Sequence, residues 1–189
     1  MRRGSRFLQA AGILLILVSL GLILGTRIYE AQSRDDAAAV TARMEELLEP
    51  RTPGIQGEGP MPALELDGRD YVCLLEVPGM NVALPVCNDW ELRNQVGNPC
   101  RYWGSVYEST LILGGSRLSQ LDFCGRLDLG DEIVITDLQG RSFSFEVQSI
   151  LRRDDASFEK LREGEYPLTI FTRDGFSNRS IVVHCGLPE

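Results

Sequence analysis

The feature that most constrains this chain is an uncharged, apolar segment near its N-terminus. Residues Phe7 to Thr26 read FLQAAGILLILVSLGLILGT and contain no charged side chain. At about 1.5 Å of rise per residue, a helix of this length crosses the roughly 30 Å hydrocarbon core of a bilayer. The segment therefore predicts a transmembrane helix over residues 7–26.

Basic residues lie mostly before this segment. Arg2, Arg3 and Arg6 precede it, and Arg27 alone follows it closely. Because positively charged flanks stay in the cytoplasm, we expect a single-pass membrane protein with a cytoplasmic tail of residues 1–6 and an extracellular C-terminal domain. A cleaved signal peptide is the alternative, but it has a shorter apolar core followed by a site of small residues, and no such site follows here.

Charge and histidine content exclude several functions. The chain has 189 residues and a net charge of −8, whereas a surface that binds nucleic acid is normally basic. Histidine occurs once, at His184, so any mechanism or metal site that needs two histidines is excluded. We expect no nucleic-acid partner, no metal and no cofactor.

The segment after the apolar run changes character twice. Val40, Met44 and Leu47–Leu48 recur at helical spacing, which predicts a helix close to the membrane. A stretch rich in proline and glycine follows and is typical of a linker. The predicted division is a membrane-proximal helix at 27–49, a Pro/Gly linker at 50–65 and a folded domain at 66–189.

Short apolar runs separated by turn signals fill the folded domain. Gln139-Gly140 separates two alternating runs and predicts a hairpin. Pro85 inside a strand indicates an edge or a bulge. The number of short strands predicts a mainly β, closed or nearly closed barrel with a few short helices. The predicted strands are 71–77, 82–86, 110–113, 132–136, 143–147, 168–171 and 181–183, and the predicted helical pieces are 90–94, 118–127 and 156–161.

Five cysteines lie in the part of the chain that we expect to be exported. Their number is odd, and no pair has the C-x-x-C spacing of metal sites and thioredoxin-like redox centres. One or two disulfides and a set of unpaired buried thiols both remain open. The cysteines are Cys73, Cys87, Cys100, Cys124 and Cys185.

Several motifs, in order, resemble the sortase family, the cysteine transpeptidases of Gram-positive surfaces. The similar stretches are Tyr71–Val86 (YVCLLEVPGMNVALPV), Asn98–Ser105 (NPCRYWGS), Thr110–Gly114 (TLILG), Leu127–Asp137 (LDLGDEIVITD) and Leu168–Arg179 (LTIFTRDGFSNR). Together they cover about residues 66–187. The resemblance implies a closed eight-stranded β-barrel with short helices, behind an N-terminal transmembrane helix.

The resemblance also implies three catalytic positions. In the family, a cysteine thiolate attacks a peptide carbonyl, a histidine protonates the leaving amine, and an arginine stabilises the developing charge or positions the substrate. The histidine position falls on Gly115 and the cysteine position on Arg173, whereas the arginine position is kept as Arg179. We therefore expect the chain to be an inactive homologue.

Other residues offer weak replacements for the missing groups. Ser116 and Thr172 flank the changed positions, but a hydroxyl without a neighbouring base is a poor nucleophile. Asp122 and Asp174 are expected to be solvated loop carboxylates. Cys124 is expected to be a buried thiol on a helical segment beside the cleft.

His184 and Cys185 are neighbours on the last predicted strand. Side chains of adjacent strand residues point to opposite faces, so the two cannot form a catalytic pair. We expect one of them in the core and the other on the surface.

Arg173 and Arg179, with Ser116 and Thr172, are the candidate ligand-binding residues. Two cations in one groove favour an anionic group such as a carboxylate or a phosphate, unless an acid such as Asp174 neutralises Arg173. Three functions remain open. The first is an inactive sortase homologue that binds a sorting-signal peptide, an active sortase, or a pilus or surface protein. The second is an active transpeptidase or hydrolase with a non-standard nucleophile, and the third is a structural envelope protein.

Overall fold

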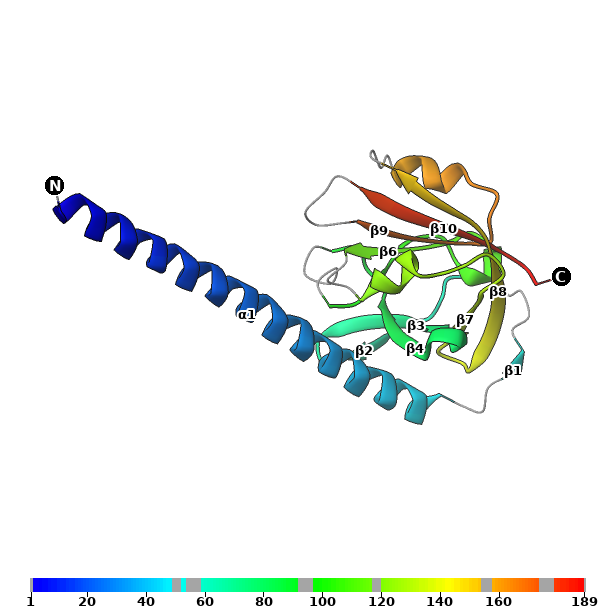
Figure 1. Cartoon of the computed structure of the whole chain (residues 1–189). Coiled ribbons are helices and arrows are strands. Elements are labelled where there is room, and N and C mark those ends of the chain that lie inside the picture. The colour runs from blue at the N-terminus through cyan, green and yellow to red at the C-terminus, as the bar shows by residue number, and fades with distance from the viewer. Residues whose placement is uncertain are drawn as a thin grey trace.

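The computed structural model describes residues 2–48, 52–53, 59–91, 97–116, 120–153, 158–173 and 179–188. A single long helix, α1 (Arg2–Leu47), leads into a β domain with short 3-10 helices (Figure 1). The strands are β1 (Thr52–Pro53), β2 (Leu64–Leu66), β3 (Arg69–Val77), β4 (Val82–Cys87), β5 (Cys100–Trp103), β6 (Leu111–Ser116), β7 (Glu132–Asp137), β8 (Arg141–Arg153), β9 (Leu168–Arg173) and β10 (Ser180–Gly186). The 3-10 helices are η1 (Pro78–Met80), η2 (Val106–Glu108), η4 (Leu121–Gly125) and η5 (Phe158–Glu163).

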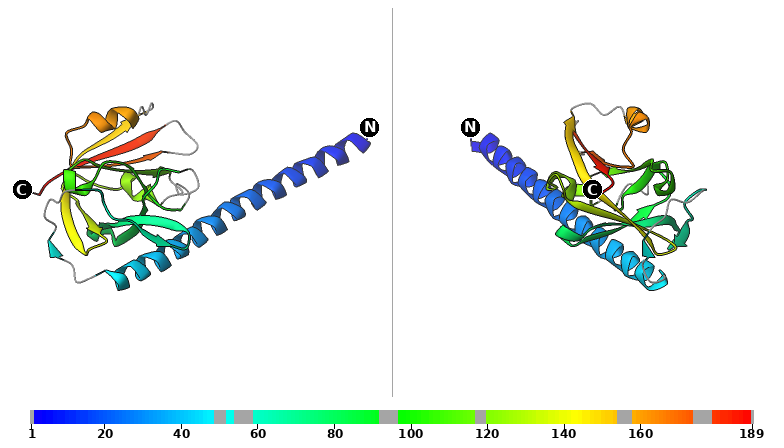
Figure 2. Two further views of the ribbon diagram at one scale, coloured as in Figure 1. Left: turned by 180° about the vertical axis from the view of Figure 1, so that it is seen from behind. Right: turned by 90° about the vertical axis from the view of Figure 1, so that its right-hand side faces the viewer.

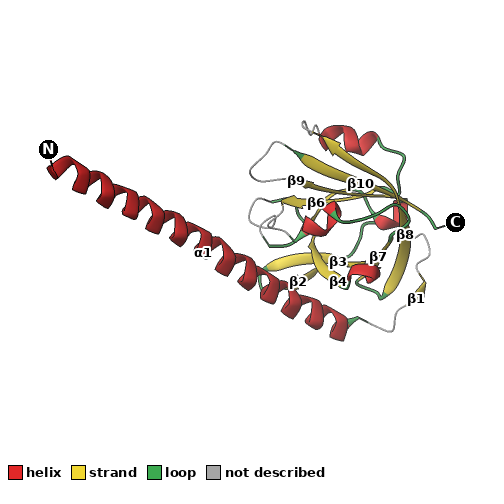
Figure 3. Ribbon diagram, viewed as in Figure 1, coloured by secondary structure: helices red, strands yellow, loops and turns green. Residues whose placement is uncertain are grey.

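Eight of these strands close into a barrel. The sheet runs in the order β8-β10-β9-β6-β5-β4-β3, and β7 pairs with both β3 and β8 to complete the ring. The two short strands β1 and β2 lie outside this ring, against β8 and β3. The prediction of a mainly β, closed eight-stranded barrel behind an N-terminal apolar helix is confirmed by this pairing. Figure 2 shows the barrel from two further sides, and Figure 3 shows its helices and strands in different colours.

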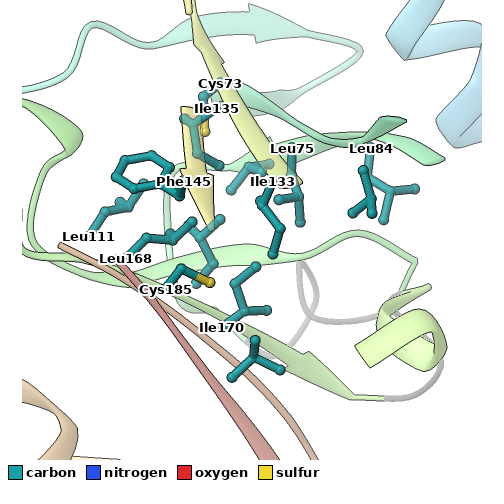
Figure 4. Packing of buried hydrophobic residues seen from close by; sticks show 14 of the residues in the cluster. Cys73, Leu75, Leu84, Leu111, Ile133, Ile135, Phe145, Leu168, Ile170 and Cys185 are labelled. Atoms are coloured by element: carbon teal, nitrogen blue, oxygen red, sulfur yellow. The ribbon is translucent and has the colours of Figure 1, made fainter. Parts of the chain in front are cut away.

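The barrel interior is a dry apolar core. Alternation along each strand sends every second side chain inward. On β7, Ile133 and Ile135 are fully buried, whereas Val134 between them is only half-buried. Strand β9 contributes Leu168 and Ile170 to the same cluster (Figure 4). The predicted hairpin is also confirmed, since β7 and β8 pair across the turn at 138–140.

The N-terminal half of α1 projects away from the barrel. Its apolar side chains from Ile13 to Leu24 are more than half exposed, and nothing in the structure covers them. This helix is long and apolar enough to cross a membrane. Exposure of so much apolar surface is unfavourable in water, so a bilayer is the environment that this segment matches.

The C-terminal half of α1 packs on the barrel beside β4 (Figure 1). Ala37, Thr41 and Met44 are buried there, at helical spacing. The edge expected at Pro85 is confirmed, because β4 pairs with β5 only at its last residue, Cys87. Leu47, at the end of the helix, is 59% exposed because it lies outside the packed stripe.

The predicted linker also contributes to the sheet. Thr52–Pro53 pair in parallel with the start of β8, and the Thr52 amide donates to the carbonyl of Gly140 at 2.9 Å. Of the predicted helical pieces, 118–127 corresponds to η4 and 156–161 overlaps η5. Most of the third, 90–94, lies outside the described residues.

Candidate functional site

Strand register brings the sequence-predicted positions together. In the parallel pair β6·β9, Gly115 lies opposite Thr172 and Ser116 lies opposite Arg173. In the antiparallel pair β9·β10, Arg173 lies opposite Ser180, which directly follows Arg179. The ends of three neighbouring strands thus meet at one place. The residue across from Arg173 on β6 is Ser116 rather than Gly115.

A pocket of about 280 Å³ opens beside these strand ends. Its lining is largely apolar, and two arginines, one aspartate and two hydroxyl side chains supply the polar groups. Thr172 and Ser180 are buried, at 3% and 1% exposure, and within the described chain their hydroxyls have no hydrogen-bond partner. Buried hydroxyls normally have a partner, so these two are suited to contact a polar ligand. The lining residues are Leu121, Asp122, Gly125, Arg152, Thr172, Arg179, Ser180 and Ile181.

The 3-10 helix η4 forms one wall of the pocket. Asp122 on this helix is exposed and forms an ion pair with Arg126 at 3.6 Å, which agrees with the solvated carboxylate expected from the sequence. Cys124 on the same helix is fully buried, as expected, and burial raises the pKa of its thiol. The other acidic candidate, Asp174, lies outside the described residues.

All five cysteines are buried free thiols. Burial raises the pKa of the Cys73 thiol, and it raises that of Cys185 to about 12. The thiolate is the nucleophilic form of cysteine, and burial keeps these thiols protonated and away from a substrate. Neither Cys73 nor Cys185 is suited to replace the family nucleophile.

His184 lies apart from the strand ends that form the pocket. It pairs with Thr169, four residues along β9 from Arg173, which is about 13 Å at strand spacing. Its Nδ1 lies 3.1 Å from the Thr169 hydroxyl, and its ring stacks on Tyr166 at 4.4 Å. The prediction that one member of the pair His184–Cys185 is a surface residue is wrong, because Tyr166 covers the imidazole and both side chains are buried.

An aromatic cluster that the sequence analysis did not identify lies against the same strands. Trp90, Tyr102 and Phe171 have ring centroids 5.2 to 5.4 Å apart. Phe171 lies against Gly114, where a Cβ atom would overlap the ring. Gly114, which precedes the position of the missing histidine at Gly115, therefore has a packing role that the sequence alone does not reveal.

The site lies on the side of the barrel toward which the N-terminal half of α1 projects (Figures 1 and 2). Gln120, between β6 and η4, connects the two regions. Its Nε2 donates to the carbonyl of Ser33 on α1 at 3.3 Å and to that of Gly97 at 2.9 Å. The contact holds the pocket wall close to the helix.

This architecture matches known structures. Sortase C-1 from Actinomyces oris has a TM-score of 0.53 with 21% identity, over 85% of this chain and 98% of that one. Sortase A from Corynebacterium diphtheriae has a TM-score of 0.54 with 14% identity, over 85% and 84% of the two chains. The fold is a sortase fold.

A third similar structure is sortase C of Clostridium perfringens with the C-terminal cell wall sorting motif. It has a TM-score of 0.53 and 16% identity, over 64% of this chain and 71% of that one. No protein-family model and no curated protein matches the sequence. The sortase likeness is thus one of fold, and activity has to be argued from the site.

Proposed function

We propose that this chain is a membrane-anchored, catalytically inactive sortase homologue that binds a sorting-signal peptide beside Arg179. The observation that carries the proposal is the meeting of three strand ends at Arg173, where the nucleophile and general-acid positions are occupied by Arg173 and Gly115. If the histidine position of the family is aligned with Ser116 instead of Gly115, the conclusion is the same, because Ser116 is not a histidine either. The only histidine of the chain is His184.

The chemistry of the pocket supports binding. Arg152 and Arg179 supply guanidinium donors, and Thr172 and Ser180 supply buried hydroxyls without partners in the described chain. Carbonyl oxygens and a carboxylate are the acceptors that such donors match. The sortase C of C. perfringens was solved with a sorting motif, and sortase E1 of Streptomyces coelicolor with a tripeptide in its active site. A peptide segment is therefore the ligand class that we propose.

The orientation of the N-terminal helix determines on which side of the membrane the peptide binds. Arg2, Arg3 and Arg6 favour a cytoplasmic N-terminus, so the proposed location of the barrel is outside the cell. The end of β9 and the start of β10, which line the pocket, lie on the side of the barrel toward the projecting helix. We propose that the ligand is a peptide held near the outer face of the membrane, as in a surface protein that is still membrane-bound. An active sortase and a pilus protein are the alternative partners.

A binding assay tests the proposal. The full chain in detergent micelles is titrated with a library of fluorescent sorting-signal peptides, and anisotropy is measured. Loss of a charge-assisted hydrogen bond costs about 1.5–3 kcal/mol, so Arg179→Ala is expected to weaken binding by about tenfold or more. The matched control is Arg43→Ala, which removes an exposed arginine of α1 that pairs with Asp67. No binding by the natural chain, or equal weakening in both variants, would contradict the proposal.

Inactivity is tested separately by peptide cleavage. The natural chain is expected to cleave none of the peptides. Two double variants restore the missing histidine and cysteine, one for each candidate position of the histidine: Gly115→His/Arg173→Cys and Ser116→His/Arg173→Cys. Acyl-enzyme formation is followed by mass spectrometry. Cleavage by the natural chain would establish the alternative, an active transpeptidase or hydrolase with a non-standard nucleophile, and Thr172 and Ser116 would be mutated first.

A further inference from the structure

Two of the five cysteines face each other across neighbouring strands. Cys87 is the last residue of β4 and Cys100 the first residue of β5, and the two are Cα partners in a parallel pair. The Cys87 amide donates to the carbonyl of Pro99 at 2.9 Å, which fixes this register. Neighbouring strands lie about 4.8 Å apart, within the Cα separation of about 4.4–6.8 Å that a disulfide requires.

The side chains of this pair share one environment. Both are fully buried, and both belong to the cluster under α1 that contains Met44, Tyr71 and Leu74. The Cys100 thiol donates to the carbonyl of Asn98 at 3.7 Å. The proximity of the two thiols lowers the pKa of Cys87 and raises that of Cys100, which agrees with their pairing in the strand register.

The other three cysteines belong to a different part of the molecule. Cys73, Cys124 and Cys185 lie in the main barrel core, on the other side of the sheet from α1. None of them is a register partner of another cysteine in the strand pairs of the described chain. An odd number of cysteines thus resolves into one cross-strand pair and three core thiols.

We propose that Cys87 and Cys100 are a modification site at which a disulfide forms when the chain meets an oxidant of the disulfide class. The bond joins the end of β4 to the start of β5. The bond thereby restrains the backbone at Gly97. The carbonyl of Gly97 accepts from the side-chain amide of Gln120 beside the pocket wall, and the same amide donates to the carbonyl of Ser33 on α1. Oxidation is expected to strengthen the connection between the helix and the pocket.

The reaction proceeds by two thiol–disulfide exchanges. The Cys87 thiolate attacks one sulfur of oxidised glutathione and expels glutathione thiolate, which leaves a mixed disulfide. The Cys100 sulfur loses its proton to solvent and attacks the Cys87 sulfur, which expels the second glutathione. Two thiols are oxidised to one disulfide, and one glutathione disulfide is reduced to two thiols. The reaction balances in the same way if Cys100 attacks first and Cys87 resolves the mixed disulfide.

Mass spectrometry of the full chain in detergent tests the proposal. The reduced chain is equilibrated with excess oxidised glutathione, both folded and by refolding in the same buffer, so that access to the buried thiols does not decide the result. Free thiols after denaturation are expected to fall from five to three. Trypsin cuts after arginine, so the peptides 70–93 and 94–101 are expected to be joined, with fragmentation placing the bond on Cys87 and not on Cys73.

A variant pair and a stability measurement complete the test. Cys87→Ser is expected to abolish the joined peptides, whereas Cys124→Ala keeps them. A disulfide that closes a loop of this length stabilises a domain enough to raise its unfolding midpoint by about 10 °C, so oxidation is expected to do so in the natural chain and not in Cys87→Ser. Five free thiols at equilibrium in both preparations, or a bond between other cysteines, would overturn the proposal.

Discussion

A buried carboxylate organises the turn between β7 and β8. Asp137 is fully buried, and its Oδ2 accepts from the Arg141 guanidinium at 2.7 Å and from the Tyr107 hydroxyl at 3.0 Å. Its Oδ1 accepts from the amides of Gln139 and Arg141 at 2.8 and 2.9 Å. Burial, and then the hydrogen bond from its hydroxyl to Asp137, raise the pKa of Tyr107 to about 12. The residue that ends the motif LDLGDEIVITD therefore has a structural role in this chain.

Removal of this carboxylate is expected to destabilise the barrel strongly. Asp137→Ala leaves the buried Tyr107 hydroxyl and the turn amides without their acceptor, and breaking a buried ion pair costs about 3–5 kcal/mol. Asp128→Ala, at an exposed position in the turn before the start of β7, is expected to change stability by less than about 0.5 kcal/mol. Urea unfolding of the full chain in detergent measures both. Similar midpoints for the two variants would contradict this account.

His184 predicts how stability depends on pH. Burial, and then the charge of Arg153, lowers the pKa of its imidazole below the ordinary value of about 6.5. The unfolded chain therefore binds a proton at a higher pH than the folded chain. The contribution of His184 to stability is present above about pH 6.5 and is lost as the pH falls toward the folded pKa. The unfolding midpoint between about pH 7.5 and pH 5.5 is expected to fall more in the natural chain than in His184→Gln. Equal slopes would show that the imidazole does not titrate as proposed.

At the scale of elements, α1 has two different surroundings along its length. The apolar side chains from Ile13 to Leu24 in its first half are exposed, and its second half buries Ala37, Thr41 and Met44 against the barrel. The Arg43–Asp67 ion pair at 3.5 Å adds little, because both side chains are exposed. Apolar burial is thus the main attraction between helix and barrel.

Truncation of the packed stripe measures this attraction. Met44→Ala removes a side chain that is 1% exposed, and such changes cost about 2–5 kcal/mol. Leu47→Ala is the matched control, because Leu47 is 59% exposed on the same turn of the helix. Thermal unfolding and protease cleavage between α1 and the barrel are expected to change only in Met44→Ala. Equal effects of the two variants would mean that the helix does not pack as described.

The contact between β6 and β9 gives a second prediction for an element. A Cβ atom at Gly114 would overlap the ring of Phe171, whereas one at Gly79 in η1 meets nothing within 4 Å. Overpacking of a core costs about 1–3 kcal/mol, so Gly114→Ala is expected to lower the unfolding midpoint and Gly79→Ala is not. An unchanged midpoint in Gly114→Ala would show that the aromatic cluster can move aside.

The whole molecule joins an apolar helix, a docked helix and a barrel in one continuous chain. The docked half of α1 covers the cluster that contains Met44, Tyr71 and Cys87. A barrel without this half exposes apolar surface, which favours aggregation. The apolar segment that is long enough to span a membrane and the segment that covers the domain are therefore parts of one helix.

Two shortened chains separate the contributions of these two segments. A chain that begins at residue 31 lacks the membrane span but keeps the docked half of α1, and it is expected to remain folded in the aqueous phase. A chain that begins at residue 59 lacks both, and it is expected to unfold at a lower temperature or to aggregate. Phase partition and thermal unfolding measure the outcome. Equal stability of the two shortened chains would show that α1 is an anchor alone.

Local sequence patterns were sufficient to predict most of the barrel strands and the apolar N-terminal helix. An uncharged apolar segment and alternating runs such as that of Ile133 and Ile135 report the surroundings of each segment directly, because strand and helix periods bring apolar residues to one face. The hairpin at Gln139-Gly140 is a local signal of the same kind. The pairing of Thr52–Pro53 with β8 and the exposure of Leu47 are not readable from the sequence, because a linker composition and a helical stripe do not say which neighbour covers a residue.

Some features of the candidate site follow from the sequence, and others follow only from the tertiary structure. By itself, the sequence determined which groups are available: one histidine, five cysteines, and Gly115, Arg173 and Arg179 at three positions of a motif. Only the tertiary structure decided which of them meet. It set Ser116 opposite Arg173, left the hydroxyls of Thr172 and Ser180 buried beside Arg179, and paired Cys87 with Cys100. The reason is physical: register and closure of a barrel depend on the packing of distant strands, which no local pattern encodes.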